Sequence, residues 1–449
     1  MQKNISGAQD KKFIMMTTQP VEKLVCRLAV PSIITMMISA IYNMADTFYV
    51  ARIDIQSPAA VGIVFSYMAF IQAVAFFFGH GSANYISRAL GAKNREGAAL
   101  IASTGFFTSF IAGVLIALTG FFFMDSILKL LGSTETIMPH AREYFRYILL
   151  GTPLIMSSFV MNNQMRFQGN AFMAMLGITF GAVLNIILDP VFIFTFNMGV
   201  SGASFATMLS QCVSFIILFR LTGRGDGIKL SIKNFRPSLS RYKEITAGGF
   251  PSLGRQGFAS LSLAYMNQLA GIYGDIAIAA LSIVNRVMMF ATSMVLGFGQ
   301  GFQPVCGFNY GAKEFMRVRH AFWFTVIITS TYCALLSVLG YVFAENVIAI
   351  FRPNDTELIS LGSCALRYEC IVYTSVGFVT ISNMYLQSIR KTIRASILAA
   401  SRQGFMLFLA LHVGIKFFGL TGIITAQPSA DALTFLIAVP FAFSALNEN

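Results

Sequence analysis

Three polar side chains within otherwise apolar stretches are the residues of this chain best suited to chemistry. Asp46 lies in PSIITMMISAIYNMADTFYVAR, residues 31–52, and Asn185 and Asp189 lie in LNIILDP, residues 184–190. A carboxylate within a bilayer costs roughly 2.5–3.5 kcal/mol on insertion scales, so an acid in such a stretch is a candidate functional residue. Asn185 and Asp189 are four residues apart and therefore project from one face of a helix.

Two carboxylates in a site of low dielectric constant repel each other, so they must share a proton, bind a cation, or both. Oxygen ligands from carboxylate, amide and hydroxyl groups suit a hard cation. Pro190 follows Asp189 directly and should kink the helix, which frees backbone carbonyls nearby. The alternative is that Asp46 and Asp189 each make a local hydrogen bond that only packs a helix. The presence of both acids in one half of the chain favours the cation site.

Four further residues are candidates for the wall of a substrate cleft. Tyr42 and Asn43 lie within about one turn of the first acid, and Arg255 and Gln256 lie in a later apolar stretch. Arg255 either faces the acids across a cleft or snorkels to the cytoplasmic membrane edge, and its position near that edge favours snorkelling. Asp431 is a third candidate acid, near a helix end or paired with another residue.

The composition indicates an integral membrane protein. The chain has 449 residues, of which 56% are hydrophobic and 11% charged, with a mean hydropathy of +0.68. Soluble proteins carry about 25% charged residues. The net charge of +13 comes from basic residues between apolar runs, which favours a membrane protein over a nucleic-acid-binding one.

The basic N-terminal region without an apolar run predicts no cleavable signal peptide. The six cysteines show no metal or disulfide spacing, and no cofactor is expected.

The apolar runs predict an all-α membrane protein with twelve transmembrane helices. If the N-terminus is cytoplasmic, 22 Lys and Arg residues lie on the cytoplasmic side and 8 on the other. This bias predicts a multi-pass protein of the inner or plasma membrane with both termini in the cytoplasm. The predicted N-terminal lobe covers residues 1–220, a basic cytoplasmic linker covers 221–247, and the C-terminal lobe covers 248–449. The positive charge of the linker is explained by a solvated loop near anionic lipid headgroups, and a regulatory or partner site is the alternative. The predicted helices cover residues 28–51, 59–84, 98–122, 142–165, 171–196, 200–220, 248–273, 277–305, 321–343, 364–386, 395–415 and 419–444.

The two halves repeat at an offset of 220 residues. Six helices per half is an even number, so both halves enter the membrane in the same direction, as in a parallel repeat. At this offset from Asp46 and Asp189 stand Met266 and Leu409, so ion coupling is predicted in the first half only. The repeated pairs are 31–32 with 251–252, 79–81 with 299–301, 91–93 with 311–313, and 199–203 with 419–423.

Nearly the whole chain resembles the MATE family of multidrug and toxin extrusion transporters, and in particular its DinF-like branch. This resemblance implies twelve helices in two pseudo-symmetric six-helix lobes that form a V-shaped cleft. The motifs that carry it are AVPSIITMMISAIYNMADTFYVARI, GHGSANYISRALGAKN, LNIILDP, GVSGASFAT and GFGQGFQPVCGFNYGAK.

The resemblance also implies a cation site. In the DinF-like branch this site is formed by an acid in helix 1, an Asn and an acid in helix 5, and a Thr in helix 6. The corresponding residues are Asp46, Asn185, Asp189 and Thr207, which all match in type and are the residues expected to hold Na⁺ if Na⁺ is the coupling ion. The NorM-like branch has further acids in helices 7 and 10, where this chain offers only Glu369.

These features together predict a secondary active antiporter, not an enzyme. It would export amphipathic, often cationic compounds in exchange for H⁺ or Na⁺ by alternating access. The sequence has no GxxxxGK[ST] fingerprint, so ATP is not expected to drive transport. One alternative is a lipid-linked saccharide flippase, for which Arg255 and Arg402 are the clear cationic candidates. Another is a membrane enzyme, for which no nucleophile with a base stands out. Expected partners are amphipathic drugs and membrane lipids, not nucleic acid, and we expect a monomer.

Overall fold

The structure is a computed structural model that describes residues 11–54, 56–224, 227–353 and 355–448. These residues form helices joined by short turns, and no strand occurs among them. The predicted all-α fold class is therefore confirmed. The first ten residues of the predicted N-terminal tail lie outside the described residues.

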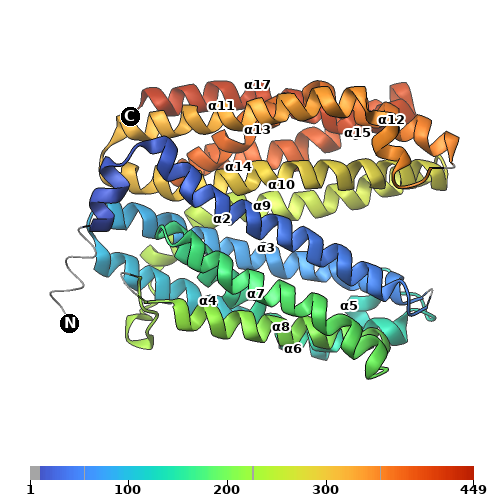
Figure 1. Cartoon of the computed structure of the whole chain (residues 1–449), viewed down its shortest axis with the longest axis horizontal. Coiled ribbons are helices and arrows are strands. Elements are labelled where there is room, and N and C mark those ends of the chain that lie inside the picture. Colours follow the sequence, from blue (N-terminus) through green and yellow to red (C-terminus); the bar gives the residue numbers. More distant parts are fainter. Residues whose placement is uncertain (1–10, 55, 225–226, 354, 449) are drawn as a thin grey trace.

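Two groups of helices lie side by side, one drawn from blue to green and the other from yellow-green to red (Figure 1). They correspond to the two predicted lobes. The first lobe contains α2 (Val21–Val50), α3 (Gln56–Gly91), α4 (Arg95–Phe122), α5 (Met124–Leu130), α6 (Met138–Phe167), α7 (Ala171–Pro190), η1 (Val191–Thr195) and α8 (Gly199–Leu221), followed by η2 (Ile232–Asn234). The second contains α9 (Leu239–Gly271), α10 (Asp275–Gly311), α11 (Phe315–Val342), α12 (Ala344–Ala349), α13 (Thr356–Ser388), α14 (Thr392–Ala400), η3 (Ser401–Phe405), α15 (Met406–Phe418), α16 (Leu420–Ile424) and α17 (Ala426–Asn447).

Eleven helical segments of the described chain are long and apolar enough to cross a membrane. Two of them are composite, because α7 continues into η1, and α14 continues through η3 into α15. The twelfth predicted span corresponds to α9, which has 33 residues and therefore ample length. It is less apolar because it carries Arg255, Gln256 and Gln268 within its length. The twelve-helix, two-lobe arrangement is thus as predicted.

The two lobes touch at the end of the bundle where α2 begins and α17 ends (Figure 1). We call this the contact end. Here α3 packs on α9 and α10, and α10 packs on α2. A Cβ atom at Gly91 would overlap the carbonyl oxygen of Phe308, and one at Gly311 would overlap that of Arg88. These two contacts are related by the 220-residue offset, so the internal repeat places a glycine against the opposite lobe twice.

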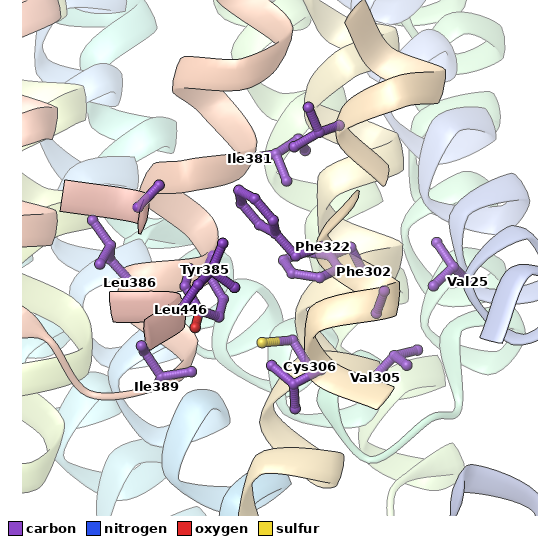
Figure 2. Close-up of a cluster of buried hydrophobic side chains, with 14 of the residues drawn as sticks. Val25, Phe302, Val305, Cys306, Phe322, Ile381, Tyr385, Leu386, Ile389 and Leu446 are labelled. Atoms are coloured by element: carbon purple, nitrogen blue, oxygen red, sulfur yellow. The ribbon is translucent and has the colours of Figure 1, made fainter. Parts of the chain in front are cut away.

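Helix α2 belongs to both lobes. Near its beginning, Val25 packs in a buried cluster with Phe302 of α10, Phe322 of α11 and Tyr385 of α13 (Figure 2). At its other end, Val50 is buried in the core of the N-terminal lobe. The helix that carries Asp46 is therefore fixed in one lobe at one end and in the other lobe at the other end.

The repeat is also visible in hydrogen bonds. Asn162 Nδ2 donates to the carbonyl of Ala174 at 2.9 Å, and Asn383 Nδ2 donates to that of Ala395 at 2.7 Å. Each bond ties the fourth span of a lobe to its fifth. Both lobes therefore use the same buried amide to position the helix that carries their intramembrane polar residues.

The segment between α8 and α9 is anchored on the N-terminal lobe. The backbone amide of Ile228 donates to Gln168 Oε1 at 2.8 Å, and that of Ser231 donates to Ser103 Oγ at 3.3 Å. Ile228 and Leu230 are buried in the core of this lobe. The described part of the predicted linker is therefore anchored by two apolar residues, whereas its basic residues Lys229, Lys233 and Arg236 are exposed, as expected for a solvated basic loop.

The C-terminal turn is held by a carboxylate with three partners. Glu448 pairs with Lys391 and with Arg394, and accepts a hydrogen bond from Ser444. These bonds, that from Lys391 first, lower the pKa of Glu448 from 4.5 to about 2. Because the pKa is depressed in the folded state, the stabilisation is present above the unfolded value and is lost as the pH falls towards 2.

We expect acid to destabilise the wild-type protein more than Glu448→Gln, which has no charge to lose. Thermal unfolding of both proteins in detergent, measured between about pH 5 and about pH 3, checks this expectation. An equal fall in the unfolding midpoint of both proteins would contradict it.

Candidate functional site

Asn185, Asp189 and Thr207 converge in the N-terminal lobe. Helix α7 carries Asn185 and Asp189 on one face, and the neighbouring α8 carries Thr207. Asn185 Nδ2 donates to Asp189 Oδ1 at 3.0 Å and to Thr207 Oγ1 at 3.3 Å. All three side chains are buried. The structure thus brings together three of the four residues that the family resemblance implies.

Asp46 joins this group from α2, which packs on α7. Its side chain is buried, and its charge acts on that of Asp189. Tyr42, one turn earlier on α2, lies within the electrostatic field of both carboxylates. Asn43 is exposed instead, and its Nδ2 donates to the carbonyl of Ser39 at 2.8 Å. Of the two cleft candidates on α2, Tyr42 is therefore the one beside the acids.

Three buried oxygens of this group have no hydrogen-bond partner among the described residues. They are Asp46 Oδ1, Asn185 Oδ1 and Asp189 Oδ2. Neither acid forms an ion pair within the described part of the chain. A buried charge or acceptor left unpaired costs free energy, and these atoms are all acceptors. Unpaired carboxylate and amide oxygens are the kind of acceptors that a proton or a hard cation such as Na⁺ requires.

The backbone at Asp189 departs from a regular α-helix. Helix α7 ends at Pro190, and the chain continues as the π-helix η1. Proline has no amide hydrogen to donate, which interrupts the regular bonding pattern. The irregularity predicted at Pro190 is therefore present, as a change of helix type directly after the acid. Single π turns occur frequently at functional sites.

Tyr144 of α6 is a residue of this site that sequence reasoning missed. It is 1% exposed, and the charges of Asp46 and Asp189 act on its hydroxyl group. In the sequence it stands among other aromatic and apolar residues of the fourth span, and nothing there separates it from a packing residue. Only the position of α6 beside the acids reveals it.

The C-terminal lobe has no equivalent pair of acids. Met266 is buried in an apolar cluster, and Leu409 is 46% exposed. Arg255 and Gln256 line a cavity within this lobe. Arg255 therefore borders a cavity of its own lobe, and its predicted reach to the cytoplasmic membrane edge stays a prediction.

Asp431 is paired. Arg402 Nε donates to Asp431 Oδ1 at 2.9 Å and Arg402 Nη2 to Oδ2 at 3.2 Å, while Gln427 Nε2 donates to Oδ1 at 2.9 Å. The aspartate and arginine side chains are only 5% and 17% exposed. Of the two roles considered for Asp431, pairing is the one present, and it removes this acid as an independent cation ligand.

We expect Asp431→Asn or Arg402→Met to lower stability by about 3–5 kcal/mol, because each leaves an uncompensated buried charge. The double variant Arg402→Met/Asp431→Leu should recover most of this loss. Thermal unfolding of the purified proteins in detergent measures the difference. Single variants as stable as the wild type would show that the pair does not hold the lobe together.

Comparison with known proteins agrees with this architecture. The MatE family model matches residues 31–191 and 251–411, one match in each half with starts 220 residues apart. The multidrug export protein MepA of Staphylococcus haemolyticus is 24% identical over 446 residues, which cover 98% of this chain and 97% of that protein. MepA of Staphylococcus aureus strain MSSA476 is 24% identical over 437 residues, with 96% and 95% covered.

Solved structures match over the same length. The outward-facing conformation of a multidrug resistance MATE family transporter of the MOP superfamily has a TM-score of 0.90 at 27% identity, covering 97% of this chain and 98% of that one. A MOP superfamily transporter from Pyrococcus furiosus, described as having a binding pocket of reverse polarity, gives the same values. With both halves matched by the family model and the whole fold shared, this chain belongs to the MatE family of membrane transporters and is not an enzyme.

Proposed function

We propose that this protein is a secondary antiporter that exports amphipathic, often cationic small molecules in exchange for H⁺ or Na⁺. The relatives, which are multidrug export proteins, support the class of cargo. One observation carries the ion coupling. Asp46 and Asp189 are buried together, have oxygens without a hydrogen-bond partner, and have no cationic partner among the described residues.

Each residue of the site has a distinct role in this proposal. Asp46 and Asp189 hold the exchangeable charge, and Asn185 and Thr207 supply neutral oxygens and fix the orientation of Asp189. The agreement of all four types with the DinF-like pattern supports placing the protein in that branch. The absence of a matching pair at Met266 and Leu409 supports coupling in the N-terminal lobe alone.

The bridging position of α2 offers a route from ion binding to movement of the lobes. Neutralising two nearby carboxylates removes their mutual repulsion and lets α2 and α7 pack differently. The beginning of α2 is part of the core of the other lobe. A shift of α2 near Asp46 would therefore also move Val25 against Phe302. The bound ion and the cargo would then favour different arrangements of the lobes, as alternating access requires.

The protein is proposed to be a multi-pass plasma membrane protein with the contact end in the cytoplasm. The excess of basic residues in the connections at this end supports the orientation. There Glu244 pairs with Arg88 at 3.6 Å and also with Arg390, which ties α9 to both α3 and the end of α13. In this orientation the lobes are closed towards the cytoplasm, which agrees with the similarity to an outward-facing structure.

Export of drugs is favoured over flipping of lipid-linked saccharides. A flippase for such a substrate needs several cationic side chains along its path to hold phosphate groups. Arg402 is neutralised by Asp431, which leaves Arg255 as the arginine without a partner among the described residues that line the cavity of that lobe. One chain contains both lobes and the whole proposed ion site, which supports function as a monomer.

Separate ion gradients test the proposed function. In proteoliposomes, we expect either an inward pH gradient or an inward Na⁺ gradient to increase efflux of a cationic dye at least tenfold over vesicles without a gradient. The gradient that acts identifies the coupling ion. A rate of dye efflux that neither gradient increases would refute the antiporter proposal. Faster turnover of a lipid-linked saccharide than of dye would also refute it.

A further inference from the structure

The chain directly before α2 lies at the contact end of the bundle (Figure 1). Residues 11–18 form a short helix there, and we call residues 11–20 the strap. Met16 of the strap is fully buried in a cluster that takes side chains from both lobes, among them Phe302 of α10 and Ala171 of α7. The strap therefore lies where the two lobes meet, although the proposed ion site uses none of its residues.

The C-terminal lobe holds the strap by its backbone. Asn309 Nδ2 of α10 donates to the carbonyl of Met16 at 3.1 Å. Arg317 Nη2 of α11 donates to the carbonyl of Gln19 at 2.6 Å and to that of Met16 at 3.4 Å. Arg317 Nε also donates to Asn309 Oδ1 at 3.0 Å, which fixes the two donors relative to each other. Hydrogen bonds from a charged donor are stronger than neutral ones, so this attachment is firm.

The strap contacts the N-terminal lobe through side chains. Lys12 Nζ donates to Asn170 Oδ1 at 3.0 Å, at the turn between α6 and α7. Lys93 Nζ, in the turn between α3 and α4, lies 4.5 Å from the centre of the Phe13 ring. A lysine ammonium group is a point charge on a flexible stem, unlike the planar guanidinium group of arginine. These contacts are therefore easier to break than the backbone attachment to the C-terminal lobe.

The internal repeat contains a counterpart of the strap. At the offset of 220 residues, the strap corresponds to residues 231–240, which end the linker and begin α9. The N-terminal lobe holds this counterpart, because the amide of Ser231 donates to Ser103 Oγ at 3.3 Å. The centre of the Phe235 ring also lies 5.4 Å from that of Phe107 in α4. The first helix of each lobe is therefore preceded by a segment that the other lobe holds.

We propose that the strap is a releasable latch between the lobes. It stays on the C-terminal lobe during transport and leaves the N-terminal lobe at Asn170 whenever the contact end opens. The inference rests on the proposed alternating access, in which the lobes must separate at this end to admit cargo from the cytoplasm. A segment fixed to α10 and α11 by its backbone cannot keep its contact with Asn170 when the lobes move apart. While attached, the strap favours the closed arrangement and thereby sets how often cargo enters.

Spin labels on the two lobes measure the latch without any transport. Ala92 and Lys313 are exposed residues in the turns that follow α3 and α10. p-Acetylphenylalanine at both positions carries the labels, so the native cysteines stay in place. Double electron–electron resonance then measures the distance between the lobes. We expect Lys12→Met and Asn170→Ala each to raise the fraction of molecules with separated lobes about fivefold, because each removes one charged hydrogen bond of the closed arrangement.

Lys23→Met is the matched control for these variants. Lys23 is an exposed lysine in the first turn of α2, outside the strap. We expect this variant to give the same distribution of distances as the labelled protein without it. An unchanged distribution in both Lys12→Met and Asn170→Ala, or an equal change in Lys23→Met, would overturn the latch.

Reversible cross-links test which lobe the strap leaves. The pair Lys12→Cys and Asn170→Cys ties the strap to the N-terminal lobe. The pair Phe13→Cys and Phe308→Cys ties it to the C-terminal lobe, since the centres of these two rings lie 5.7 Å apart. A short bis-methanethiosulfonate reagent closes each link, and a reductant opens it. We expect the first link to lower gradient-driven dye efflux at least tenfold and the second to leave it unchanged.

The open form of each pair is the control for its closed form. Efflux that continues with the first link closed, or that the second link stops equally, would overturn release from the N-terminal lobe. Efflux from the reduced proteins tests the antiporter proposal separately, so a link without effect leaves that proposal standing. If the reduced proteins and the wild type do not export dye under either gradient, the antiporter proposal fails. The spin-label distances still decide in that case whether the strap holds the lobes together.

Discussion

Asp46→Asn and Asp189→Asn are each expected to reduce gradient-driven dye efflux at least tenfold. Each variant replaces a carboxylate that can exchange a proton or Na⁺ with an amide that has no charge to neutralise. The remaining acid then has no repelling neighbour, so ion binding no longer changes the packing of α2 against α7. Proteoliposomes with an imposed pH or Na⁺ gradient measure the effect.

Asp125→Asn is the matched control for these variants. Asp125 is an exposed aspartate of α5 that pairs with Arg142 at 2.7 Å, so its environment differs from that of the two buried acids. We expect it to transport like the wild type. Asp189→Asn should still bind dye with wild-type affinity when no gradient is present. This measurement separates a defect in ion coupling from loss of the dye-binding site. Full gradient-driven efflux in both Asp46→Asn and Asp189→Asn would rule out the proposed ion site.

The second large effect is expected at the contact end. Gly91→Ala and Gly311→Ala each place a methyl group where the backbone carbonyl of the opposite lobe already lies. A backbone carbonyl moves only if its helix moves, so the lobes must separate there. We expect each variant to lower transport at least tenfold and the double variant to lower it further, because the closed arrangement of this end becomes unfavourable.

A native cysteine reports on the same movement. Cys306 of α10 is fully buried in the cluster shown in Figure 2. We expect a maleimide to label it faster in Gly311→Ala than in the wild type, as read by mass spectrometry. Gly62→Ala is the control, since a Cβ atom at Gly62 meets no atom within 4 Å. Normal transport and unchanged labelling in both contact-end variants would show that the lobes do not need this close approach.

Several features could be predicted from the sequence because they depend on local pattern. Apolar runs of membrane length predicted the spans, and the four-residue spacing of Asn185 and Asp189 predicted their shared helix face. The repeat at 220 residues predicted equivalent contacts in both lobes, and Gly91 and Gly311 provide them. These inferences hold because helix geometry and internal duplication are properties of the chain itself.

Other features required the tertiary structure. The cavity beside Arg255 could not be predicted, because the position of a residue along α9 does not reveal what lies next to it. Tyr144 and the pairing of Asp431 with Arg402 depend on which faces of distant helices meet. The basic residues of the linker are exposed as expected, but only the structure shows that Ile228 and Leu230 anchor it on the N-terminal lobe.

The sequence by itself determined that this is a twelve-helix membrane protein with a duplicated plan and two intramembrane acids in its first half. Only the tertiary structure decided that Asp46 and Asp189 share one buried site and that α2 reaches from this site into the other lobe. The physical reason is that the length of an apolar run and the spacing of residues on a helix depend only on neighbouring residues in the sequence. Which charges meet, and which stay unpaired, depends on how helices far apart in sequence pack against one another.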